Sequence, residues 1–134
     1  MISPVFIDTV GLIAIWDRTD KWHAAASTVY SGLKADLTPM ISTSYVLLEC
    51  GNAAARKPFR NSADRVRIRL VETDGLIVPS ETDWNMAWDA YGRGEAGDAG
   101  IVDQVSFIVM RRLGITRAFT NDQHFRAAGF ETLF

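Results

Sequence analysis

The sequence has 134 residues, of which 48% are apolar and 22% charged, and its formal net charge is −2. This length and apolar content suit a single domain over residues 1–134, and the slight acidic excess argues against a protein that holds nucleic acid through overall basic charge. With one cysteine, no cationic start and no apolar stretch long enough for a signal peptide or membrane span, we expect a cytoplasmic protein without a membrane anchor.

Short β-like runs alternate with longer helix-like stretches along the chain. The predicted strands are short apolar runs bounded by polar, glycine or proline residues, and they cover Pro4–Ile7, Pro39–Ser42, Leu76–Pro79, Arg117–Thr120 and Phe130–Leu133. Between them, the sequence pattern predicts helices over Val10–Asp17, Trp22–Leu33, Tyr45–Lys57, Ala63–Thr73, Asp83–Tyr91 and Ile101–Leu113, with a last turn over Gln123–Ala128. Such alternation is typical of an α/β fold in which helices cover both faces of a mostly parallel sheet of about five strands.

Local signals mark several helix ends. Ser44 and Ser62 can cap the third and fourth predicted helices, because a serine oxygen accepts hydrogen bonds from backbone N–H groups of the first turn. Gly114 and Gly129 supply the left-handed residue that commonly ends a helix.

The segment Gly92–Gly100 contains a formal G-x-G-x-x-G pattern, which is also the fingerprint of dinucleotide-binding loops. That fingerprint follows a strand and opens a helix in the first βα unit, whereas here the pattern follows a predicted helix late in the chain. We therefore predict a flexible loop at this position and no dinucleotide site.

Two aspartates follow predicted strands. Asp8 comes directly after the run Val5–Ile7, and Asp122 comes two residues after Thr120. In an open α/β sheet the ligand crevice lies outside the carboxyl ends of the strands, so both acids are candidates for a site there. Each is also well placed to cap the following helix, and the sequence alone leaves both roles open.

Two further acids lie in apolar helices that begin at the same edge of the predicted sheet. Asp103 is in the first turn of Ile101–Leu113 and shares a helical face with Phe107 and Met110. A buried, unpaired carboxylate is costly, so burial of Asp103 would require a neutralising partner such as a cation. Glu49 has a similar apolar setting. If either acid is exposed, a solvated helix surface explains it equally well.

Together, Asp8, Glu49, Asp103 and Asp122 bring four acidic groups to one edge, with no basic residue next to any of them in the sequence. Like charges repel unless a cation lies among them, and oxygen ligands suit Mg²⁺, with Mn²⁺ as a substitute, better than zinc. Metal sites of this kind hydrolyse phosphodiesters by activating water, orienting the phosphate and offsetting charge on the leaving oxygen. The sequence therefore predicts metal-dependent phosphodiester hydrolysis.

The remaining reactive side chains are assigned to packing. Cys50 lies in an apolar helical pattern with no histidine near it in the sequence, which favours a core position over a nucleophile. His23 and His124 are too far apart for a local metal-ligand motif, and we expect packing or capping roles, although His124 borders Asp122. We therefore expect a metal ion, not a histidine pair, to supply the nucleophile.

Basic and aromatic residues mark candidate contact surfaces. The basic residues crowd one stretch and the end of one helix, at Arg56, Lys57, Arg60, Arg65, Arg67, Arg69, Arg111 and Arg112. They suit RNA phosphates, but a solvated helix surface explains them as well. Several aromatic side chains exceed the needs of a small core, so some should line a protein interface: Trp16, Trp22, Tyr30, Trp84 and Trp88.

Four segments that carry the acids are similar to the motifs of one family: Val5–Thr9, Ser42–Glu49, Ile101–Phe107 and Ala118–Phe125. Through them the sequence resembles the PIN-domain family, and more narrowly the VapC-type toxins of bacterial toxin–antitoxin pairs, over nearly the whole chain. The resemblance implies a three-layer α/β/α sandwich and Mg²⁺- or Mn²⁺-dependent endoribonuclease activity, with catalytic and metal-binding roles for the four acids. It also implies a homodimer and a cognate antitoxin that silences the enzyme.

The resemblance assigns supporting polar residues as well. Thr9 and Thr120 match positions that orient the acids in that family. Within Glu95–Gly100 the family often has a lysine and a serine before the third acid, whereas this chain has Gly-Asp-Ala-Gly, so Asp98 is a candidate accessory acid. This departure, and the diversity of the family, leave the RNA target open.

Other functions fit less well. An aspartyl-phosphate phosphatase needs a second aspartate two residues after Asp8, where Val10 stands. A receiver domain needs a lysine after the final core strands, and Arg117 and Arg126 are poor substitutes. A non-catalytic PIN scaffold that binds RNA or a protein stays open; the complete set of acids weighs against it, and dependence of cleavage on added Mg²⁺ or Mn²⁺ would discriminate the two.

Overall fold

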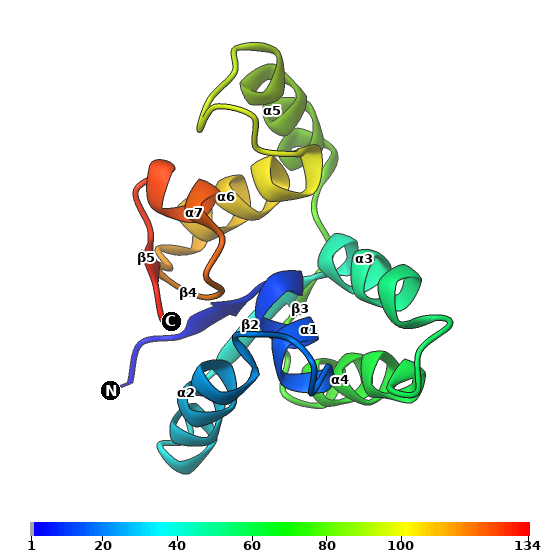
Figure 1. Ribbon diagram of the computed structural model, residues 1–134. Helices are drawn as coiled ribbons and strands as arrows, with labels where there is room; N and C mark the ends of the chain where they lie inside the picture. The colour runs from blue at the N-terminus through cyan, green and yellow to red at the C-terminus, as the bar shows by residue number, and fades with distance from the viewer. Residues whose placement is uncertain (1) are drawn as a thin grey trace.

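A computed structural model describes residues 2–134 and places five parallel strands in one sheet, in the order β3-β2-β1-β4-β5 (Figure 1). The strands are β1 Val5–Ile7, β2 Met40–Thr43, β3 Leu76–Ile77, β4 Arg117–Phe119 and β5 Glu131–Thr132. The central strand β1 pairs with β2 and with β4, and its residues are fully or almost fully buried. The predicted α/β fold is confirmed, and the sheet is parallel throughout.

Seven helices cover the sheet on both faces. They are α1 Thr9–Trp16, α2 His23–Ala35, α3 Ser44–Ala54, α4 Arg60–Glu72, α5 Glu81–Gly92, α6 Ile101–Leu113 and α7 Gln123–Ala127. Figure 1 shows α1, α2 and α4 on one side of the sheet and α6 and α7 on the other, with α5 packed outside α6. The arrangement is the three-layer α/β/α sandwich that the resemblance implies.

Aromatic side chains fill the core between the sheet and the helices α6 and α7. Phe107 of α6 and Phe125 of α7 meet edge to face with their ring centroids 4.9 Å apart, and both are buried with Phe119 of β4. Such contacts fix the spacing between helices and sheet. Gly11 is required in α1, because a Cβ there would lie 2.2 Å from the carbonyl oxygen of Phe119. This close approach holds the first turn of α1 against β4.

Two predicted helix caps are wrong and two helix ends are confirmed. The helix α3 begins at Ser44, so the preceding Thr43 is the cap and accepts a hydrogen bond from the Val46 N–H. The helix α4 begins earlier than predicted, which puts Ser62 inside its first turn. Gly114 and Gly129 have φ of 71° and 98°, in the left-handed region that glycine adopts without strain.

Two other predictions from the sequence agree with the structure. Cys50 is fully buried in the main core, and burial raises the pKa of its thiol to about 12, which is unsuited to a nucleophile. The glycine-rich pattern begins at Gly92, the last residue of α5, and continues through the connection to α6, where Gly94 and Gly97 have positive φ; the flexibility of this loop stays a prediction. Over residues 2–134, no helix has the length and apolar character needed to cross a membrane.

Candidate active site

The strand register brings Asp8 beside Thr120. The central strand β1 pairs with β4 so that Ile7 lies opposite Phe119. Asp8 directly follows Ile7, and Thr120 directly follows Phe119. The Thr120 hydroxyl donates a hydrogen bond of 2.9 Å to Asp8 Oδ2 and accepts one of 3.1 Å from the Asp122 N–H. One threonine thus positions two of the acids. Thr120 is itself fully buried, so this connection is shielded from water.

Asp8 is buried at the carboxyl end of the central strand, with 2% of its surface exposed. It also caps α1, accepting a hydrogen bond of 3.4 Å from the Val10 N–H. The pKa of Asp8 is raised from 3.8 to about 7, mainly by burial and next by the negative charge of Asp103, while the Thr120 hydroxyl opposes the shift. The capping role and the place in the acidic cluster therefore coexist at one residue.

Asp103 lies in the first turn of α6, with its side chain 19% exposed, so the expected burial is partial. Phe107 and Met110 on the same face are buried as expected. The pKa of Asp103 is raised to about 6, first by burial and then by the charges of Asp122 and Glu49. The shift shows that the other acids are close enough to repel it.

Asp122 caps the short helix α7 and faces the cluster at the same time. Its Oδ1 accepts a hydrogen bond of 2.9 Å from the His124 N–H. As with Asp8, the two roles that the sequence left open are both present.

The apolar neighbours of Glu49 in the sequence suggested a buried side chain, but Glu49 is exposed on α3. The helix buries Val46, Cys50 and Ala54, one helical turn apart, and Glu49 lies beside that stripe. It is nevertheless tied to the site, since the Thr9 hydroxyl donates a hydrogen bond of 2.8 Å to Glu49 Oε1. Thr9 thus holds one acid, as Thr120 holds two.

His124 lies inside the cluster, whereas the sequence analysis expected a packing or capping role at the border of the site. Its Nδ1 is 2.8 Å from Asp122 Oδ1, and its Nε2 is 2.6 Å from Asp98 Oδ1. The hydrogen bond with Asp98 is the main cause that raises the pKa of His124. The sequence signal was the position of His124 two residues beyond the capping Asp122, in the first turn of α7.

Three of these side chains are arranged to share one cation. Asp103, Asp122 and His124 each offer a ligand atom, and the three atoms lie within 4.8 Å of one another, while Asp8 and Glu49 flank this group. Across residues 2–134, no lysine or arginine forms an ion pair with Asp8, Glu49, Asp103 or Asp122. The acids fit a divalent cation, because it would relieve the repulsion that, after burial, raises the pKa values of Asp8 and Asp103.

The metal-free protein should lose stability as the pH rises from 5 to 8. The unfolded chain releases the protons of Asp8 and Asp103 near pH 4, whereas the folded protein keeps them up to pH of about 7 and 6. The native state therefore holds more protons in this window, and between pH 5 and pH 8 the free energy of unfolding falls by about 1.4 kcal/mol for Asp103 alone.

Urea unfolding of chelator-treated protein at pH 5 and pH 8 measures this trend, and added Mg²⁺ should restore stability at pH 8. Asp17, Asp83 and Asp98 have lowered pKa values, so their contribution changes only below pH 4. The raised pKa of His124 acts in the same direction as the acids, because the folded protein keeps that proton above pH 6.5 and the stability it contributes is lost as the pH rises further. Equal stability at both pH values would contradict the assignment of a repelling acidic cluster.

The basic residues divide into two groups. Those near α4 are all exposed, and contact with RNA phosphates stays a prediction for them: Arg56, Lys57, Arg60, Arg65, Arg67 and Arg69. Arg111 and Arg112 lie at the end of α6 opposite Asp103 and have other partners. Arg112 pairs with Asp83 at 2.8 Å, and Arg111 donates to the Ala128 carbonyl. For these two residues as well, contact with RNA phosphates stays a prediction.

Comparisons with known proteins agree with this architecture. A family model described as PIN domain matches residues 5–131. The 23S rRNA-specific endonuclease VapC20 of Mycobacterium tuberculosis, from strains CDC 1551 and H37Rv, is 30% identical over 136 residues, covering 94% of this chain and 95% of the relative. The crystal structure of Mycobacterium tuberculosis VapC20, described as a sarcin-ricin loop cleaving toxin, matches with a TM-score of 0.76 and 25% identity over 94% of this chain and 95% of that one.

Proposed function

This chain belongs to the PIN-domain family, and on that premise we propose that it is a metal-dependent endoribonuclease, the toxin of a toxin–antitoxin pair. The observation that carries the proposal is the set of acids at the carboxyl edge of the sheet, which has no lysine or arginine partner among residues 2–134. We propose a single nuclease domain over residues 1–134 that acts in the cytoplasm on RNA.

In this mechanism Asp8, Asp103 and Asp122 would hold Mg²⁺, for which Mn²⁺ would substitute. The bound cation would activate water and offset charge on the phosphate and leaving oxygen. Thr120 fixes Asp8 and the backbone of Asp122, so that the acids are oriented before RNA arrives.

Glu49 serves the same reaction from the open side of the site. One oxygen is held by Thr9, and the exposed carboxylate would join the other acids around the bound cation. Asp98 and Thr9 are accessory groups that position their neighbours.

The competing function is a PIN scaffold that binds RNA without cutting it. Incubation of purified protein with RNA, in chelator and after restoring Mg²⁺, separates the two functions. A nuclease produces fragments only with the cation, whereas a scaffold retains intact RNA in both conditions. Since one relative is named for 23S rRNA, that RNA is the first substrate to test.

We propose that the chain forms a homodimer through an exposed aromatic row on α3 and α5. Tyr45, Trp84, Trp88 and Tyr91 contact edge to face, with successive ring centroids 5.9, 5.7 and 5.3 Å apart. Trp84 and Trp88 are each 42% exposed, and exposed aromatic rings in a row are typical of protein interfaces.

The substitution Trp88→Glu should convert the dimer to a monomer. Loss of a central aromatic side chain costs about 2 kcal/mol or more, which raises the dissociation constant roughly 30-fold or more. Light scattering over a concentration series measures the change. Trp22→Glu is the control, because Trp22 is equally exposed at 41% but lies outside the row. A wild-type protein that stays monomeric at all concentrations would contradict the homodimer.

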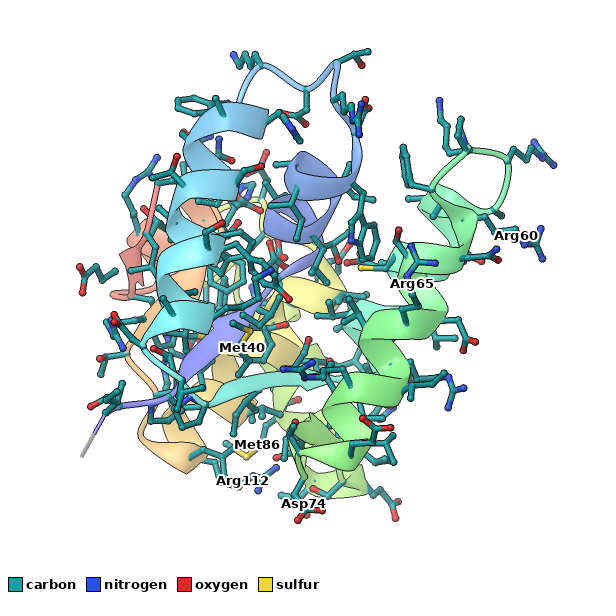
Figure 2. The ribbon with its side chains drawn as sticks, turned by 90° about the horizontal axis from the view of Figure 1, so that it is seen from below. Met40, Arg60, Arg65, Asp74, Met86 and Arg112 are labelled. Carbon is teal, nitrogen blue, oxygen red and sulfur yellow. The ribbon has the colours of Figure 1, made fainter. Side chains whose placement is uncertain are left out.

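A cleft of about 850 Å³ is the proposed docking surface for the antitoxin. It lies between α2 and α4, and Figure 2 labels two of its lining residues, Met40 and Arg65. Its lining combines apolar side chains with Lys34, Arg65 and Arg69 against one acid, Glu72. This charge suits an amphipathic segment with acidic residues. The predicted interface role of Trp16 and Tyr30 corresponds to this cleft, which both residues line.

Substitution of the cleft residue Ile68 by glutamate should weaken binding of the antitoxin roughly 30-fold, or about 2 kcal/mol, by placing an acid in an apolar and cationic surface. Ile68 is 41% exposed, so the chain should still fold. Co-purification with the small protein encoded beside this chain measures the effect. Val71→Glu, on the same helix but outside the cleft lining, is the control. Equal co-purification of all three proteins would contradict this docking surface.

A further inference from the structure

His124 is held on both edges of its ring by carboxylates. Nδ1 lies 2.8 Å from Asp122 Oδ1 and 4.0 Å from Asp103 Oδ2. Nε2, on the opposite edge, lies 2.6 Å from Asp98 Oδ1. The ring therefore connects two acids of the cluster to one acid of the loop that precedes α6.

The two nitrogens are suited to different roles. A histidine that binds a metal through one nitrogen commonly donates the N–H of the other to a carboxylate, which fixes the tautomer and orients the ring. Asp98 is placed for this second contact at Nε2. With the proton on Nε2, the lone pair of Nδ1 is directed toward Asp122 and Asp103.

The spacing on the Nδ1 side also suits a shared cation. With bonds of about 2.1 Å, two ligand atoms of an octahedral ion lie about 3.0 Å apart when adjacent and about 4.2 Å apart when opposite. The separations of Nδ1 from the two acids, 2.8 and 4.0 Å, are close to these values. His124 can thus join the two carboxylates around one ion without a large movement.

We propose that His124 Nδ1 is a metal ligand beside Asp103 and Asp122, that Asp98 is the positioning residue for the ring, and that the nitrogen ligand makes the site prefer Mn²⁺ to Mg²⁺. The inference rests on the proposed function in that it requires the site to bind a divalent cation. The preference follows from ligand chemistry: carboxylate oxygens suit both ions, whereas imidazole favours transition metals over Mg²⁺.

Pulsed electron paramagnetic resonance of the Mn²⁺-loaded protein tests the nitrogen ligand directly. The wild type should show coupling of Mn²⁺ to one imidazole nitrogen, and His124→Gln should lose it. His23→Gln is the matched control, because His23 is the other of the two histidines and its Nδ1 contacts the Ala14 carbonyl. The control should keep the coupling, and circular dichroism verifies that both variants fold.

Calorimetric titration with each ion tests the preference. His124→Gln should weaken Mn²⁺ binding about 10- to 100-fold and Mg²⁺ binding by less than about 3-fold. Asp98→Asn, which keeps the imidazole, should weaken Mn²⁺ binding roughly 10-fold.

The outcomes separate this inference from the proposed function. Tight Mn²⁺ binding without nitrogen coupling would overturn the role of His124 and leave the nuclease proposal intact. Equal losses of Mn²⁺ and Mg²⁺ binding in His124→Gln would overturn the preference. Failure of the wild type to bind either ion would overturn both the inference and the proposed function.

Discussion

The substitution Asp103→Asn should abolish RNA cleavage while leaving the fold intact. The amide keeps the shape of the side chain but loses the charge that holds the cation at the start of α6. We expect cleavage to fall by about 10²- to 10³-fold or more, as when a group that stabilises transition-state charge is removed. The rate of RNA cleavage in saturating Mg²⁺ measures this loss.

The same substitution should raise the stability of the metal-free protein at pH 8, by about 1 to 3 kcal/mol. Removal of one carboxylate relieves the repulsion that raises the pKa of Asp8, for which the charge of Asp103 is the second cause after burial. Urea unfolding in chelator measures the change. Asp89→Asn, an exposed acid on α5, is the control and should alter neither property. Near-normal, metal-dependent cleavage by Asp103→Asn would contradict the assignment of the site.

Removal of the metal should reduce RNA cleavage at least as much as the substitution Asp103→Asn. Excess chelator should reduce cleavage by about 10³-fold or more, and Mg²⁺ or Mn²⁺ should restore it, because in the proposed mechanism the cation would activate the attacking water. Ca²⁺ should bind the same acids yet inhibit, since its longer bonds and looser coordination place water and phosphate less accurately. The rate of RNA cleavage, measured with each ion in turn, shows which ions support the reaction and which inhibit it.

The histidine His23 provides a control for this experiment, because its ring contacts the backbone of α1 and not the acids. His23→Ala should keep full metal-dependent activity. Full activity of the wild type in chelator would show that a side chain, not a cation, generates the nucleophile.

The sequence predicted the strand-end acids well because the rule behind them is topological. Parallel strands end at one edge, so an acid directly after β1 and another shortly after β4 must lie near each other once the strands pair. The pattern left open whether each acid caps a helix or lies in a site; the structure shows that Asp8 and Asp122 cap helices and that both also lie in the acidic cluster.

The exposure of Glu49 could have been predicted, and the contact of His124 with Asp98 could not. The buried positions of α3 repeat every four residues from Val46, which excludes Glu49 from the stripe. Asp98 reaches His124 only because the loop before α6 folds back, with left-handed backbone at Gly94 and Gly97, and no local pattern specifies that path. A contact across 26 residues depends on tertiary packing.

The most direct test of the proposed nuclease is the chemistry of the RNA ends that the purified protein produces. Metal-stripped protein is incubated with 23S rRNA before and after addition of Mg²⁺, and the new termini are mapped and their phosphates identified. If water activated by the cation attacks the phosphate, fragments appear only after the addition and carry no 2′,3′-cyclic phosphate. Fragments formed in chelator, or ending in a cyclic phosphate, would contradict metal-dependent hydrolysis at this site.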